Sequence, residues 1–221
     1  MPYHLHFGYV WQHFDRLLSG LALSLGMAAL AIAIGVTIGL ALAVAHVSGG
    51  RATRAAIQAY VEILRNVPLL LLVYLVFYGI PTQLDLRYGA TASFVATLAI
   101  YAGAYLVEVF RAGLAAVPAG LIEAGKAIGL TPWQRLLHVR LPTMLRICLP
   151  ALGNTFVSLF KDTAVAAVIA VPELTFGAQW IQLNSFRVVE VFLVITLMYL
   201  GTGYAMLRLM RLLERRFAVD R

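Results

Sequence analysis

Long apolar stretches alternate with short polar or basic segments along the whole chain. A helix needs about 20 mostly apolar residues to cross the ~30 Å hydrocarbon core of a bilayer. Residues 17–45 meet this requirement without a charged side chain, and four more apolar segments span residues 67–78, 88–107, 147–171 and 188–207. The pattern predicts an all-α integral membrane fold with about five transmembrane helices.

Two of these segments carry features that bear on packing. Gly35 and Gly39 are spaced so that a neighbouring helix can approach closely, although glycine is also simply frequent in membrane helices. In the fourth segment, Lys161 and Asp162 interrupt the apolar run. An amphipathic stretch before the second segment ends at Arg65, and we expect it to lie between the first two spans.

The basic residues are distributed unevenly between the connecting segments. With five crossings, one side has three of them, Arg16, Arg87 and Arg187. The other side has thirteen: Arg51, Arg54, Arg65, Arg111, Lys126, Arg135, Arg140, Arg146, Arg208, Arg211, Arg215, Arg216 and Arg221. Because cytoplasmic loops carry the excess of positive charge, this predicts a periplasmic N-terminus and a cytoplasmic C-terminus. Four or six spans would divide the basic groups between both faces.

The composition agrees with a lipid-facing surface. The chain of 221 residues is 62% hydrophobic and 12% charged, with a mean hydropathy of +0.86, whereas soluble domains are about 25% charged. A net charge of +7 would suggest nucleic-acid binding in a soluble protein. Here the basic residues flank apolar runs, so we expect contact with anionic membrane lipid, as at residues 208–216, and no nucleic acid. The first helix lacks a preceding basic segment and is too long for a signal peptide, so we expect it to be retained.

The sequence contains few residues in patterns typical of a catalytic or metal-binding site. Cys148 is the only cysteine, which excludes an intrachain disulfide. We interpret His4, His6 and His13 as surface histidines and predict no metal site. No phosphate-binding G-x4-G-K-[ST] loop or catalytic set of side chains occurs in the sequence. The chain is therefore not expected to hydrolyse ATP or to be an enzyme by itself.

The basic segment between the third and fourth spans has an organised pattern. Residues 121–128 are predicted to form a short helix after Pro118, and Thr131-Pro132 has the residues of an N-cap and first helical position for a second. In that second helix three apolar residues share one face, namely Trp133, Leu136 and Leu137. Leu141-Pro142 is expected to stop the helix. Two short helices with an apolar stripe predict a docking surface for a soluble partner.

The same segment resembles the EAA loop of ABC importer permeases, E-A-A-x3-G-x9-I-x-L-P. The spacing of the pattern falls on Glu123, Ala124, Gly125, Gly129, Val139, Leu141 and Pro142. Gly125 replaces an alanine of the pattern and Val139 an isoleucine. Glycine inside a helix costs about 1 kcal/mol relative to alanine, so we expect a slightly looser loop. The resemblance implies that residues 115–142 couple the chain to an ATP-hydrolysing subunit.

Flanking segments resemble the polar amino-acid uptake branch of these permeases. They are residues 60–70, 108–113, 149–154 and 161–163, with Val67 in place of a threonine common in the branch. The resemblance implies one transmembrane permease domain over residues 1–221 of a type I importer in the bacterial inner membrane, working by alternating access. It implies ABC ATPase subunits that bind ATP and Mg²⁺, a periplasmic binding protein, a second permease, identical or paralogous, and a substrate such as histidine, glutamine, glutamate, arginine or lysine. No cofactor is expected in this chain.

Apart from Glu190 near the outer end of the fifth segment, three charged residues are expected within the membrane: Glu108 at the end of the third segment, and Lys161 and Asp162 in the fourth. A charge there costs roughly 2.5 kcal/mol or more and is retained where it is paired or lines a cavity. In one hypothesis, these residues and Thr163 line a substrate pocket in which a carboxylate meets the α-ammonium of an amino acid. In the other, Lys161 and Asp162 pair with other helices and fix the packing.

Two other classes of protein are compatible with an apolar chain of this kind. An ion-gradient-driven secondary transporter or channel could use Glu108 and Asp162, but the inverted repeats typical of such transporters are not found. A membrane-embedded enzyme would need a catalytic set that the sequence does not show. Neither class needs a docking loop for an ATPase, which favours the importer permease.

Overall fold

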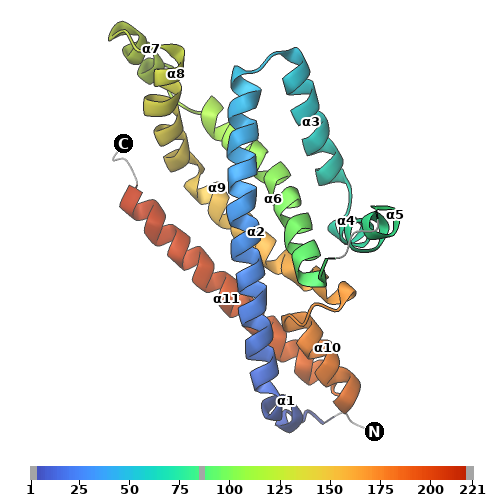
Figure 1. Cartoon of the computed structure of the whole chain (residues 1–221). Helices are drawn as coiled ribbons and strands as arrows, with labels where there is room; N and C mark the ends of the chain where they lie inside the picture. The colour runs from blue at the N-terminus through green and yellow to red at the C-terminus, as the bar shows by residue number, and fades with distance from the viewer. Residues whose placement is uncertain (1–3, 85–87, 218–221) are drawn as a thin grey trace.

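The computed structural model describes residues 4–84 and 88–217. Within these ranges the chain is helical and contains no β-strand, as predicted. Figure 1 shows the elements, which are α1 (Gly8–Gln12), α2 (Phe14–Ser48), α3 (Arg51–Asn66), α4 (Leu69–Tyr74), the π-helix η1 (Leu75–Gly79), α5 (Ile80–Leu84), α6 (Ala90–Ala115), α7 (Ala119–Ala127), α8 (Pro132–Arg135), the π-helix η2 (Leu136–Arg140), α9 (Leu141–Asp162), the 3₁₀-helix η3 (Thr163–Ile169), α10 (Leu174–Ser185) and α11 (Val188–Phe217).

Four continuous helical stretches in the described residues are long and apolar enough to cross a membrane. They are Phe14–Ser48, Ala90–Ala115, Pro132–Ile169 and Val188–Arg216. A fifth span results if Arg51–Asn66 and Leu69–Leu84 are counted together, although they meet at a bend of 102°. The prediction of about five transmembrane helices is therefore confirmed.

The bend corrects one part of the sequence interpretation. Val67 and Pro68 are both extended, because proline disfavours the helical conformation in the residue before it and has no N–H to donate. α3 packs along α2 and α6 as a helix of the bundle and not as a connecting segment, so Arg65 at its end lies beside α6. It is the first half of the fifth span if the bent pair is counted as one.

The small residues of α2 allow a close and extensive contact with α6. A Cβ added to Gly35 would lie 2.7 Å from the Cβ of Ala102, and one added to Gly39 would lie 2.7 Å from the Cβ of Leu106. Any larger side chain would push the helices apart. The close approach predicted from the spacing of the two glycines is confirmed.

The fourth span runs further than the sequence predicts. The prediction that Leu141-Pro142 stops the preceding helix is wrong. A widened π-turn carries the chain past the proline, because the Leu141 N–H donates to the Leu136 carbonyl, five residues back. Lys161 and Asp162 do not break the helix either. α9 passes through them into η3, which ends at Ala170 in the left-handed region.

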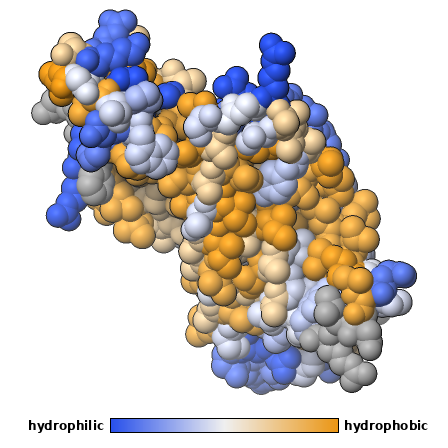
Figure 2. All heavy atoms as spheres, turned by 45° about the horizontal axis from the view of Figure 1, so that its top comes forward, coloured by the Kyte–Doolittle hydropathy of each residue, from blue (hydrophilic) through white to orange (hydrophobic). Residues whose placement is uncertain are grey.

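The polar segments of the chain gather at the two ends of the bundle. The α2–α3 turn, α7, α8 and the last turns of α11 lie at one end, whereas α1 and α10 lie at the other (Figure 1). Apolar residues cover much of the surface between them (Figure 2). Arg87 and Arg221, which entered the count of basic residues, lie outside the described residues.

Candidate functional site

A polar cavity of about 370 Å³ lies between α6 and α9. Asp162, half-buried at the last turn of α9, is the charged residue of its lining. The hydroxyl oxygens of Tyr101 and Tyr105 are 3.0 Å apart on the opposite helix, and the rest of the lining is Asn154, Thr155, Ser158 and Leu159. Hydroxyl and amide groups surround one carboxylate, which is a suitable environment for a small polar cation or ammonium group.

A second, charged cavity of about 220 Å³ is formed by the end of α2, by α3 and by α6. Glu108 lines it and accepts two hydrogen bonds from Arg111, of 2.8 Å and 3.1 Å. Arg65 from α3 approaches the same carboxylate less closely, with its Nη1 4.0 Å from Glu108 Oε2. Glu62 is a further acidic residue of the lining.

Tyr105 connects the two cavities. Its hydroxyl contacts Tyr101 within the cavity of Asp162, and its ring centroid lies 5.3 Å from the guanidinium carbon of Arg65, which lines the cavity of Glu108. The structure therefore places two of the expected substrate-site residues, Asp162 and Glu108, in adjacent cavities that share α6.

The other two expected residues lie elsewhere. Thr163 is fully buried and donates its hydroxyl hydrogen bond to the Phe160 carbonyl, so it supports the start of η3 rather than lining either cavity. Lys161 is exposed and is not a lining residue of these cavities. Neighbouring residues of a helix point about 100° apart, so the three consecutive side chains cannot share one pocket.

Sequence reasoning missed a buried carboxylate at the other end of the molecule. Glu173 is fully buried at the N-cap of α10, where it accepts a hydrogen bond from the Phe176 N–H. Its second oxygen accepts from Ser24 at 3.1 Å and from Tyr199 at 3.2 Å. The one local signal is an acidic residue after Pro172, before an apolar helix. This cluster ties α2, α10 and α11 together.

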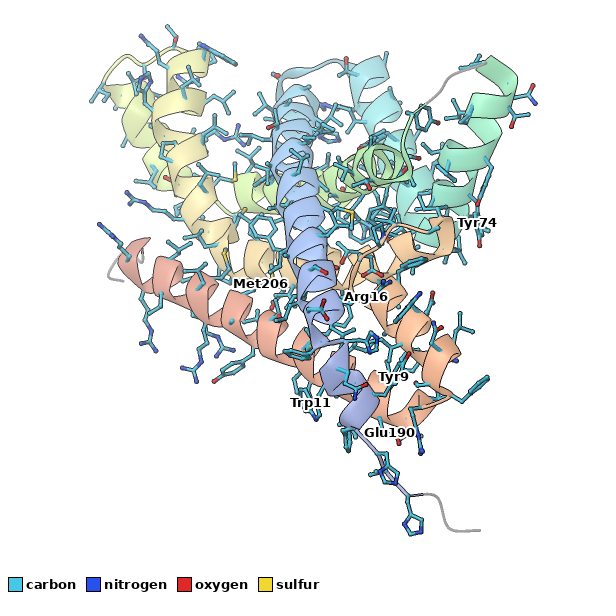
Figure 3. The ribbon with its side chains drawn as sticks, turned by 60° about the horizontal axis from the view of Figure 1, so that its bottom comes forward. Tyr9, Trp11, Arg16, Tyr74, Glu190 and Met206 are labelled. Atoms are coloured by element: carbon cyan, nitrogen blue, oxygen red, sulfur yellow. The ribbon has the colours of Figure 1, made fainter. Side chains whose placement is uncertain are left out.

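A second group of polar contacts holds the N-terminal segment at the same end. Glu190 is buried in the first turn of α11, accepts from the His6 N–H at 2.8 Å and pairs with Arg187 at 3.6 Å. It lies close to α1, near Tyr9 and Trp11 (Figure 3). On α2, the guanidinium of Arg16 stacks 3.9 Å from the centre of the Trp180 ring.

The histidines expected at the surface take part in these contacts. His13 stacks on Tyr9 and lies against Trp180. No group of three metal-ligating side chains that could hold an ion occurs among the described residues.

The loop between α6 and α9 forms two short helices, near the predicted positions. Pro118 is the N-cap of α7 rather than its first helical residue. Thr131 caps α8 in a reciprocal capping box with Gln134, which confirms the predicted start of that helix. Gly129 has φ +81, a conformation that favours glycine, and it ends α7.

The loop presents an exposed face and a covered one. Glu123 and Ala124 are exposed, and so are Trp133 and Ile128, with 58% and 77% of their surface accessible. Gly125 is buried on the other face, where the aliphatic stem of Arg135 covers it. Exposed apolar side chains beside acidic and small residues form a surface suited to another protein.

The chain belongs to the family described as binding-protein-dependent transport system inner membrane component, which matches residues 35–219. It is 32% identical over 211 residues to the glutamine transport system permease protein GlnP of Escherichia coli K12, covering 95% of this chain and 96% of that protein. It is 33% identical to the octopine transport system permease protein OccM of Rhizobium radiobacter, over 93% and 87% of the two chains.

Solved structures show the same architecture. A chain of an amino acid ABC transporter crystallised with histidines superimposes with a TM-score of 0.89 at 32% identity, over 97% of this chain and 100% of that one. A chain of the inward-facing MetNI methionine ABC transporter has a TM-score of 0.77 at 20% identity, which supports the fold alone. The protein is thus a multi-pass inner-membrane permease subunit of the ABC importer class.

Proposed function

We propose that the chain is the membrane-spanning subunit of an ATP-driven importer that carries polar amino acids across the inner membrane by alternating access. The observation that carries the proposal is the position of Asp162, a half-buried carboxylate in a polar cavity between two membrane-spanning helices. A charge at such depth is retained where it serves a solute or a partner group. Relatives named for glutamine and octopine transport support an amino-acid substrate.

In this proposal Asp162 binds the α-ammonium of the amino acid, and the hydroxyls of Tyr101 and Tyr105 supply further hydrogen bonds. Glu108 lies in the next cavity along α6 and would meet the solute on its way toward the α7–α8 end. Thr163 and Lys161 act indirectly: Thr163 by fixing the start of η3 beside Asp162, and Lys161 from the exposed side of the same turn.

Energy reaches the chain through the α7–α8 loop. The exposed residues Glu123, Ala124, Ile128 and Trp133 would bind an ABC ATPase subunit, which holds ATP and Mg²⁺. Gly125 and Gly129 shape the loop, while Leu141 and Pro142 join it to α9. Because that helix continues without a break to Asp162, movement of the loop is transmitted directly to the proposed substrate cavity.

The proposed complex has two permeases and a defined orientation. Asn154 and Ser158 of the cavity lining are exposed in the single chain, although polar groups are rarely turned toward lipid, so we propose that a second copy or a paralogue covers them. The basic residues at the α7–α8 end support a cytoplasmic position for that end and a periplasmic N-terminus, where a substrate-binding protein would dock.

The test is ATP hydrolysis by the chain reconstituted in liposomes with a matching ATPase and binding protein. Liganded binding protein should stimulate hydrolysis and uptake in the wild type. The double variant Glu123→Arg, Gly129→Trp should lose both, because it alters the exposed face and the positive-φ turn. Solute movement without an ATPase, unaffected by the loop variant, would instead indicate gradient-driven transport.

A further inference from the structure

The cavity beside Asp162 is electrostatically incomplete for an amino acid. A free amino acid carries both an α-ammonium and an α-carboxylate at neutral pH. Asp162 complements the ammonium, but no cationic side chain is among the lining residues, which are Tyr101, Tyr105, Asn154, Thr155, Ser158, Leu159 and Asp162. A cation next to this cavity would complete it for a zwitterion.

Arg65 stands next to the cavity, across one aromatic ring. Its guanidinium carbon lies 5.3 Å from the centroid of Tyr105, whose hydroxyl faces the cavity. Asp162 lines the cavity together with both tyrosines, Tyr101 and Tyr105. The two opposite charges therefore flank the same tyrosine pair, one from α3 and one from α9.

Arg65 is also free to change partners. Its side chain is 44% exposed, makes no hydrogen bond within the described part of the chain, and lies 4.0 Å from Glu108. Glu108 is already neutralised by two hydrogen bonds from Arg111. Arg65 can therefore leave Glu108 without exposing an unpaired carboxylate, and its planar group can bind a substrate carboxylate through two parallel hydrogen bonds.

We propose that Arg65 binds the α-carboxylate of the transported amino acid while Asp162 binds its α-ammonium, with Tyr105 between them. This assignment rests on the proposed function and makes Arg65 a substrate-binding residue, although its position in the sequence suggests a topology-determining arginine in a loop. It predicts that the cavity recognises the two groups shared by all amino acids and selects strongly against molecules that lack the carboxylate.

The test measures binding directly, because a binding protein would itself select the substrate. Radiolabelled L-glutamine, L-arginine and L-histidine are bound to the permease–ATPase complex in detergent by equilibrium dialysis, and each is displaced by the unlabelled amino acid or its α-amide. In the wild type the α-amide should compete about tenfold or more weakly. Arg65→Gln should weaken amino-acid binding by about tenfold or more and leave the α-amide unchanged, which removes the preference.

Two further variants separate the effect of the charge at residue 65 from the effects of side-chain geometry and of a general loss of stability. Arg65→Lys should retain part of the preference, because an ammonium pairs with a carboxylate less geometrically than a guanidinium does. Arg54→Gln, the same change three turns earlier on α3 and outside both cavities, should retain all of it. Basal ATP hydrolysis by each complex shows that it is assembled; if Arg65→Gln does not assemble, the comparison of Arg65→Lys with wild type decides.

The outcomes distinguish this inference from the function on which it rests. If Asp162→Asn abolishes binding but the Arg65 variants keep the wild-type preference, Arg65 does not bind the carboxylate and the importer proposal is unaffected. If the wild-type complex binds none of the three amino acids, and liganded binding protein does not stimulate hydrolysis, both proposals are wrong.

Discussion

Cys148 on α9 lies directly against Gly113 on α6, so that its sulfur occupies the space that a Cβ at residue 113 would need. The thiol also donates to the Val109 carbonyl at 3.3 Å. These two helices carry both the proposed substrate cavity and the ends of the coupling loop. Their crossing point is therefore fixed by one glycine and one small buried side chain.

Replacing Gly113 by alanine should lower the free energy of unfolding by about 1–3 kcal/mol, because the new methyl group overlaps the Cys148 sulfur. Thermal denaturation of the detergent-solubilised protein measures the effect. Gly26→Ala is the control, since a Cβ there meets no atom within 4 Å. In a Cys148→Ala background the loss should be much smaller; an equal loss in both backgrounds would show that this contact is not its cause.

The carboxylate of Glu173 should be a main source of stability at the end of the bundle formed by α1 and α10. Glu173→Ala would leave the Phe176 N–H without its acceptor, at a cost of roughly 1–3 kcal/mol, and would leave the Ser24 hydroxyl with the Gly20 carbonyl as its acceptor. Glu173→Gln keeps an acceptor oxygen and should cost less. Thermal unfolding compares the two variants, and equal losses would indicate that charge, not the number of acceptors, is responsible.

The approximate number of spans and the positions of the first, third and fifth could be predicted because the length of an apolar run is a local property of the sequence. Gly35 and Gly39 likewise indicated that some helix can approach closely, since small residues at this spacing form a flat surface on any helix, but not that α6 is the one that does. The start of α8 at Thr131 could be predicted from the dipeptide Thr131-Pro132, which suits an N-cap and a first helical position. Each of these features depends on residues near one another in the chain.

The features that sequence could not provide depend on distant partners. Pro68 indicates a break, but only packing against α2 and α6 places α3 within the bundle and Arg65 beside Glu108. Glu173 meets Ser24, 149 residues away. Pro142 was read as a stop because the widened turn that bypasses it has no clear sequence pattern. The direction in which Thr163 points follows from the 3₁₀ geometry of its segment, which the sequence does not specify.

Asp162 provides a prediction about which substrates are carried. Its carboxylate is the one charge of the cavity lining and is proposed to bind the α-ammonium that all amino acids share, so Asp162→Asn should reduce uptake of cationic and neutral amino acids by similar factors, about tenfold each. Uptake of radiolabelled arginine and glutamine into liposomes holding the assembled complex measures the ratio. Ser185→Ala, outside this cavity, is the control. A loss confined to arginine would mean that Asp162 contacts the cationic side chain and not the α-ammonium common to both.

The α7–α8 loop is tighter at Gly125 than its composition suggests. The Arg135 side chain crosses from α8, lies over Gly125 and donates to the Leu130 carbonyl at 2.5 Å. A Cβ at residue 125 would be 3.3 Å from the Cγ of Arg135, so an alanine there requires the arginine to move by a few tenths of an ångström. Glycine and arginine at these two positions therefore fix the angle between α7 and α8 together.

Two opposing effects should make Gly125→Ala depend on Arg135. Alanine favours the helix by about 1 kcal/mol, but it also disturbs the arginine that joins the two helices. We expect the full stabilisation of α7 in an Arg135→Ala background and a clearly smaller one when Arg135 is present. Hydrogen exchange of the amides of residues 119–135 in the assembled complex measures local stability, and the ratio of substrate transported to ATP hydrolysed reports coupling. Additive effects in this double-mutant cycle would show that the two residues act independently. A lower ratio of substrate transported to ATP hydrolysed, confined to Gly125→Ala with Arg135 present, would identify their contact as the element that sets the angle between α7 and α8.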